Sequence, residues 1–155
     1  MSVLIEEAAK KAAVAWVNDR LVWTAWLNGA FYVVGGPGEQ LVPELSDDAP
    51  ALVSLRGDHN GRIVTFPARV STVDPGAEDW GVSVAQLATK RLNGPGTAEE
   101  TLARWAEQNQ VFRLEPTGDT AALPDGSLAA APRPTPATRL PKRPFRLHRV
   151  RKRPN

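Results

Sequence analysis

The chain has 155 residues, of which 42% are hydrophobic, and it contains no cysteine, which excludes disulfides, thiolate metal sites and cysteine nucleophiles. The formal net charge is only +2, but charge is unevenly distributed along the chain. Residues 1–131 hold ten Lys and Arg and all 17 Asp and Glu, a net charge of −7, whereas residues 132–155 hold nine Lys and Arg and no acid, a net charge of +9. This asymmetry predicts an acidic domain followed by a cationic arm that binds a polyanion.

The first third of the sequence predicts a helix followed by a hairpin. Residues 3–17 have the apolar periodicity of an amphipathic helix. Two apolar segments, 21–27 and 30–34, then flank Asn28-Gly29. Both positions of a two-residue hairpin turn take positive φ, which Asn and Gly tolerate best, so the pattern predicts an antiparallel hairpin.

A loop over 41–49 precedes two further strands, which are predicted over 51–55 and 63–73 with a turn at 57–61. Asp74-Pro75 then suits the start of a helix, since Asp caps helices and Pro fits the first turn. This helix is expected to bury one stripe of side chains and to end near Asn93-Gly94; the stripe consists of Trp80, Val84, Leu87 and Ala88.

The last elements of the domain are a helix and a strand. Thr97 and Glu100 have the spacing of a capping box, which predicts a helix over about 98–108. A closing strand is predicted over 111–114. Antiparallel strands with short turns, and one strand that returns after two helices, indicate an α+β, mainly β protein: a small antiparallel barrel with flanking helices.

The domain organisation follows from composition. Residues 1–118 are expected to form the barrel domain, residues 119–139 an Ala/Pro-rich linker, and residues 140–155 a basic tail. The N-terminus has no basic and apolar leader pattern, and no apolar run approaches the ~20 residues that span a bilayer. The sequence therefore predicts a cytoplasmic protein without a membrane partner.

Few residues suggest chemistry. The two histidines lie in the 57–61 turn and in the tail, so no metal site is predicted and no catalytic residue is identified. Gly36 and Gly38 follow a strand, where backbone amides approach a phosphate closely. Arg56 and Arg62 flank the 57–61 turn and are candidates to bind the same phosphate. A turn without a ligand and two solvated arginines are the alternatives.

Three segments resemble the flavin- and deazaflavin-binding split-barrel superfamily, which includes pyridoxamine-phosphate oxidase-like proteins. They are residues 31–38 (FYVVGGPG), 48–55 (DAPALVSL) and 66–76 (FPARVSTVDPG), and residues 111–116 (VFRLEP) look like the closing strand of that family. The resemblance implies a split β-barrel, FMN or a deazaflavin as cofactor, and an oxidoreductase that transfers hydride through its cofactor. A homodimer is considered as a further partner. The chain departs from the family before the barrel: the basic segment that binds the cofactor phosphate in the deazaflavin branch has no counterpart in residues 1–20.

The tail predicts a different function, a non-enzymatic module associated with nucleic acid or ribonucleoprotein. Basic and apolar side chains alternate there, so cations could follow phosphates while an aromatic ring stacks on a base. A solubilising or self-docking tail is the alternative, and an anionic membrane is the least favoured partner because prolines interrupt any amphipathic helix. The predicted nucleic-acid-binding residues are Arg139, Lys142, Arg143, Phe145, Arg146, Arg149, Arg151, Lys152 and Arg153.

Overall fold

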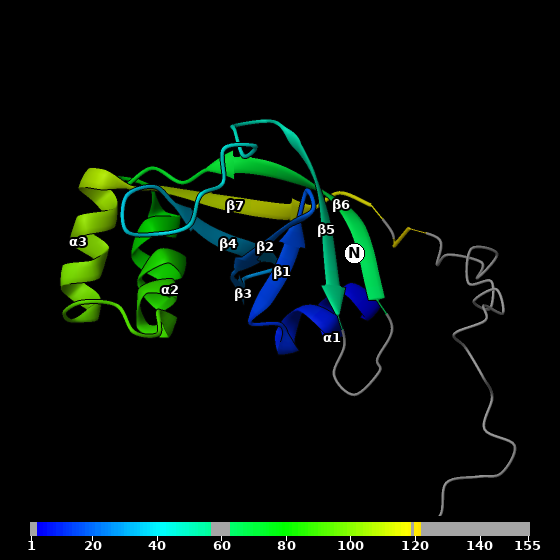
Figure 1. Cartoon of the computed structure of the whole chain (residues 1–155), viewed down its shortest axis with the longest axis horizontal. Helices are drawn as coiled ribbons and strands as arrows, with labels where there is room; N and C mark the ends of the chain where they lie inside the picture. Colours follow the sequence, from blue (N-terminus) through cyan, green and yellow to red (C-terminus); the bar gives the residue numbers. More distant parts are fainter. Residues whose placement is uncertain (1–2, 57–62, 119, 122–155) are drawn as a thin grey trace, which may run out of the picture. The chain divides into compact units, whose positions relative to one another are not determined.

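The computed structural model describes residues 3–56, 63–118 and 120–121 (Figure 1). The 57–61 turn, Arg62, most of the predicted linker and the cationic tail lie outside the described residues. Within the described part of the chain, no helix is long and apolar enough to cross a membrane.

The described residues form a seven-stranded antiparallel sheet that curls into a nearly closed barrel (Figure 1). Its strand order is β2-β1-β5-β6-β7-β4-β3. The strands are β1 (Val14–Val17), β2 (Arg20–Trp23), β3 (Ala25–Leu27), β4 (Ala30–Gly35), β5 (Pro50–Arg56), β6 (Ile63–Thr72) and β7 (Gln110–Pro116).

Thr24 lies where the barrel comes closest to closing. The two edge strands of the sheet, β2 and β3, are consecutive in the chain and are separated by this residue alone. The Thr24 amide donates to the carbonyl of Ala13 at 3.0 Å, next to β1, and its hydroxyl donates to the carbonyl of Tyr32 on β4 at 2.9 Å. One residue therefore hydrogen-bonds to both sides of the seam.

Alternate side chains of β4 enter two different cores, which explains why all six of its residues are buried. Phe31 and Val33 pack inside the barrel, whose open end is covered by α1 (Val3–Lys11) through Ile5 and other apolar residues. Tyr32 and Val34 point the opposite way. There they pack with the helices α2 (Ala85–Lys90) and α3 (Ala98–Gln108), which lie together on one side of the sheet in Figure 1.

The sequence correctly predicts the barrel, the loop after β4 and the last helix and strand. The turn at Asn28-Gly29 is also confirmed, with φ of 48° and 82°. The helix over 3–17 is wrong in its second half, because α1 ends at Lys11 and residues 14–17 form β1. Their side chains alternate between exposed and buried, which is strand periodicity, but in the sequence Trp16 also follows Ala12 by four residues, which fits a helix. The segment 21–27 is likewise broken, at Thr24, into two strands.

The helix expected from Asp74-Pro75 begins later than predicted. Residues 74–77 form a turn in which the amide of Ala77 donates to the carbonyl of Asp74, and a π-helical turn, η1 (Trp80–Val84), leads into α2. The predicted buried stripe is confirmed in full. A π-helical turn is rare and is frequently found at functional sites.

The capping box of α3 gives a direct stability prediction. The hydroxyl of Thr97 accepts from the amide of Glu100 at 3.2 Å, and the Glu100 carboxylate accepts from the amide of Thr97 at 2.7 Å. Thr97→Ala is expected to lower the free energy of unfolding by about 1 kcal/mol. Urea denaturation measures this, with Thr89→Ala as control, since the Thr89 hydroxyl only bonds the carbonyl of Gln86 in the preceding turn. Equal losses in the two variants would contradict the capping role.

Candidate ligand-binding site

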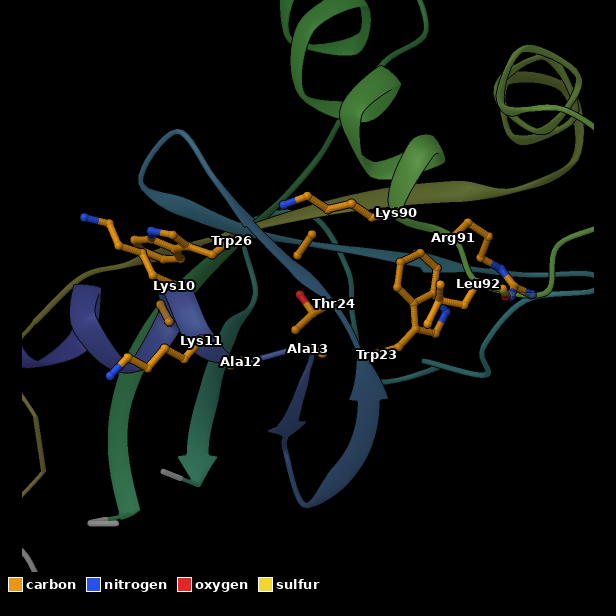
Figure 2. A pocket seen from close by; sticks show the side chains of 12 residues that line it. Lys10, Lys11, Ala12, Ala13, Trp23, Thr24, Trp26, Lys90, Arg91 and Leu92 are labelled. Carbon is orange, nitrogen blue, oxygen red and sulfur yellow. The ribbon is translucent and has the colours of Figure 1, made fainter. Parts of the chain in front are cut away.

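A cavity of about 430 Å³ opens between the C-terminal end of α1, the seam of the barrel and the end of α2 (Figure 2). Its volume lies in the range of about 300–1,000 Å³ that is typical of small-molecule sites. Two tryptophans and four cations line it, together with alanines, Thr24 and Leu92. The lining residues are Ala9, Lys10, Lys11, Ala12, Ala13, Trp23, Thr24, Ala25, Trp26, Lys90, Arg91 and Leu92.

Two tryptophans line this cavity, one on each side of Thr24 in the sequence. Residues three apart on one regular strand point to opposite faces of the sheet. Trp23, at the end of β2, packs against the core on the helix side, and Trp26, in β3, packs against the barrel core, and both line the same cavity. Figure 2 shows Thr24 between them, with Trp23 and Arg91 on one side and Trp26 on the other. The ring of Trp26 is supported from within the barrel by Phe31, at a centroid distance of 4.7 Å.

Arg91 and Trp23 form a cation–aromatic pair at the cavity wall. Arg91 is the residue directly after α2, and its guanidinium carbon lies 5.6 Å from the centroid of the Trp23 ring. A guanidinium in this position over Trp is held by about 0.5–2 kcal/mol. Trp105 also contacts Trp23, at a ring-centroid distance of 6.3 Å.

The charge of the lining is positive, because Lys10, Lys11, Lys90 and Arg91 contribute four cations and no acid lines the cavity. Lys10 is also paired with Glu6, one turn earlier on the exposed side of α1, at 2.6 Å. Cations next to aromatic surfaces favour a ligand that has both a flat ring and an anionic group.

A buried carboxylate lies behind the cavity wall. Glu39 follows β4, and its side chain is 0% exposed. It accepts from Arg91 Nε at 2.9 Å, from Arg104 Nη2 at 3.0 Å and from Trp105 Nε1 at 3.0 Å. The adjacent residue, Gln40, binds the backbone of Trp23.

The residues that the sequence suggested for a phosphate do not come together. Arg56 pairs with Ile63 at the start of β6, whereas Gly35 pairs with Gln110, beyond the other end of β6. The ten residues of β6 separate these two positions by roughly 30 Å along the sheet. Arg56 and the glycine segment therefore do not form one site, and Arg62 lies outside the described residues.

The glycines themselves have a different role from the one expected. The amide of Gly36 donates to the carbonyl of Gln40 at 3.1 Å, so it is engaged within its own turn. Gly36 has φ of +117°, and a Cβ there would lie 3.0 Å from Nδ2 of Asn109. Gly38, with φ of +73°, faces open space. Gly36 thus permits a tight reversal of the chain against the end of α3. Its N–H is already hydrogen-bonded and is not free to bind a phosphate.

A second, more open hollow of about 670 Å³ lies beside this turn. Gly36, Leu41, Asn109 and Phe112 are among its lining residues. The Asn109 amide donates to the carbonyls of Gly35 and Pro37 and so fixes the turn to the end of α3. The hollow has no cluster of cations or aromatic rings comparable with that of the first cavity.

A polar network surrounds the π-helical turn on the helix side of the sheet. The Tyr32 hydroxyl donates to Asp79 at 2.6 Å, the Ser83 hydroxyl donates to the same carboxylate at 2.6 Å, and the Asn28 amide donates to Ser83 at 2.9 Å. Burial raises the pKa of Tyr32, and the hydrogen bond to Asp79 raises that pKa further. The phenol is therefore a neutral donor, and the network connects the hairpin turn to η1.

Sequence reasoning missed the cavity for specific reasons. Lys10 and Lys11 lay inside a longer predicted helix, and Lys90 and Arg91 lay near the end of another predicted helix. Nothing in the sequence indicated that these two pairs of cations lie close together in the fold. Trp23 and Trp26 looked like ordinary hairpin residues. No signal in the sequence connected them, because the seam at Thr24 forms through hydrogen bonds to Ala13 and Tyr32.

No family model and no curated protein sequence matches the chain. Two solved structures are similar to it. The heme storage protein HutZ from Vibrio cholerae matches with a TM-score of 0.53 and 15% sequence identity, over 76% of this chain and 91% of HutZ. The flavocytochrome Anf3 from Azotobacter vinelandii matches with a TM-score of 0.45 and 16% identity, over 91% of this chain and 85% of Anf3.

The likeness to HutZ and the nearly closed antiparallel barrel define the class of fold. The chain has the split-barrel, FMN-binding-like fold, as the resemblance in its sequence predicted. At 15% identity the likeness concerns the fold alone.

Proposed function

We propose that this protein binds a flavin or deazaflavin nucleotide in the cavity between α1 and α2. One observation carries the proposal: the same cavity wall presents two tryptophans and four cations and no acid. The rings offer surfaces for an isoalloxazine-like system, and the cations offer partners for a phosphate. The site differs from the one that the sequence suggested, but the class of ligand is the same.

Heme fits this cavity less well than a flavin does. Heme iron is held in proteins by His, Cys, Met or Tyr side chains. None of the twelve residues that line the cavity is one of these. A flavin needs no such ligand, since ring contacts and charge-assisted hydrogen bonds suffice to hold it.

Oxidoreductase activity would follow from such a cofactor, because a flavin or deazaflavin supplies hydride transfer. The contribution of this chain would be to bind the ring beside Trp23 and Trp26, to hold the phosphate with Arg91 and the lysines, and to limit access of water. The described residues around the cavity include no evident acid or base apart from the lysines. Cofactor binding is therefore the part of the proposal that the site supports most directly.

Calorimetric titration with FMN tests the proposal. The wild-type protein is expected to bind FMN, and Lys90→Gln combined with Arg91→Gln is expected to weaken binding roughly tenfold or more by removing two charged partners of the phosphate. Arg69→Gln is the matched control, because Arg69 is an exposed cation on β6 that does not line the cavity and pairs with Pro50, at the opposite end of β5 from Arg56. Loss of binding in the Arg69 variant alone would place the site elsewhere, and absence of FMN and deazaflavin binding by the wild type would refute the proposal.

The uneven distribution of charge along the chain favours a second function, in which the arm binds single-stranded nucleic acid. The nine cations of residues 132–155 follow a domain with a net charge of −7, so the arm is the part of the chain that suits a polyanion. This proposal rests on the sequence, since the arm lies outside the described residues. It is compatible with the first, because the two functions use different parts of the chain.

A further inference from the structure

We infer that Glu39 is a positioning residue that orients Arg91 over Trp23, and so gives the cavity its preference for a ligand with a phosphate next to a flat ring. The inference rests on the proposed function, because it concerns the same cavity. Glu39 lines neither this cavity nor the second hollow, and it acts through Arg91.

The geometry around Glu39 determines which edge of Arg91 is bound. Glu39 Oε2 accepts from Nε of Arg91, and Nη1 of Arg91 donates to the carbonyl of Leu92. These two bonds engage nitrogens on opposite sides of the guanidinium and leave Nη2 with no hydrogen bond among those the structure describes. The Arg91 side chain is 21% exposed, so this nitrogen is the donor suited to an anion in the cavity.

Gln40 fixes the other member of the pair. Its Oε1 accepts from the amide of Trp23 at 2.6 Å, and its Nε2 donates to the carbonyl of Trp23 at 3.0 Å. The backbone of Trp23 is thus bound on both polar groups at the end of β2. Two adjacent side chains, Glu39 and Gln40, therefore set the cation and the ring of one binding surface.

The glycine turn explains how both side chains reach these positions. The chain reverses after β4 through Gly36, and the hydrogen bond between Gly36 and Gln40 closes the reversal. Residues 39 and 40 thereby return beside the end of β4, where Gln40 forms a bridge with Gly35, and bind Arg91 and Trp23. The glycines act on the ligand indirectly, by positioning the residues that position the cavity wall.

The test compares FMN with riboflavin, which lacks the phosphate, in three proteins. Wild type is expected to bind FMN more tightly than riboflavin. Glu39→Gln keeps the size of the side chain but presents an amide to Arg91, and it is expected to lose roughly tenfold in FMN affinity while riboflavin affinity changes less than about twofold. Arg104→Gln is the matched control, because Arg104 binds the other oxygen of Glu39 and does not line the cavity. It is expected to keep the preference for FMN.

Equal loss of FMN and riboflavin affinity in Glu39→Gln, or an unchanged preference, would overturn the inference. If Glu39→Gln does not fold, Arg91→Lys tests the same point, since it keeps the charge but loses the Nε bond to Glu39, and it should also lose the preference. If the wild type binds neither compound, the proposed function fails. Hydrogen exchange of Arg91 Nε–H by NMR then decides separately whether Glu39 fixes Arg91: slow exchange in wild type and Arg104→Gln but fast exchange in Glu39→Gln supports positioning, and equal exchange rates refute it.

Discussion

Replacing Trp105 by alanine is expected to lower the free energy of unfolding by about 3–5 kcal/mol, the range for removal of a large buried aromatic side chain. Trp105 is 0% exposed and lies in the core between the helices and the outer face of β4. The substitution also removes the Nε1 donor from the buried Glu39 carboxylate and the ring that supports Trp23. Cavity formation and loss of a buried hydrogen bond thus act in the same direction.

Trp16→Ala provides the matched control for this prediction. Trp16 lies on β1, is 47% exposed and takes part in neither buried core. Its removal is expected to lower the free energy of unfolding by about 1 kcal/mol or less, as for most substitutions at exposed positions. Chemical denaturation followed by circular dichroism measures both. A Trp105 variant as stable as the Trp16 variant would show that α3 does not belong to the core described.

The sequence predicted those parts of the fold that depend on local chemistry. The Asn28-Gly29 turn, the Thr97 capping box and the buried stripe from Trp80 to Ala88 each follow from neighbouring residues, and each is confirmed. The start of the sheet was missed because residues 14–17 fit two periodicities. Two pairings decide between them: a local one with β2 through the turn at Asn18 and Asp19, both at positive φ, and a long-range one with β5.

The candidate site was less predictable than the fold because it is assembled from distant segments. α1, the seam at Thr24 and the end of α2 meet only through the closure of the barrel. The break at Thr24 and the path of the chain after Gly36 both depend on hydrogen bonds that span the seam or the turn. Glu39 gave no signal in the sequence at all, since a single acid after a glycine turn usually faces solvent.

Deleting residues 132–155 is expected to abolish binding of single-stranded RNA and DNA. The deletion removes nine cations and leaves a protein that repels the same polyanion. Binding by the full chain should be tolerant of sequence and should weaken steeply with salt, because each phosphate neutralised on a single strand contributes a slope of roughly −0.7 in log K against log salt. Engagement of about five cations would give a slope of about −3.5 by the same relation.

Three proteins separate charge from chain length in this prediction: the full chain, residues 1–131, and a full-length variant with all nine cations of the arm replaced by Gln. The truncated protein and the Gln variant should both fail to bind nucleic acid, because the interaction depends on charge. Phe145→Ala should retain the salt slope but lose ~1–3 kcal/mol of binding free energy if the ring stacks on a base. Titration of labelled oligonucleotides at several salt concentrations measures all of these terms. Binding by the Gln variant at wild-type strength, or equal binding by the full chain and residues 1–131, would exclude the arm as an electrostatic nucleic-acid ligand and leave the barrel cavity as the functional part of the protein.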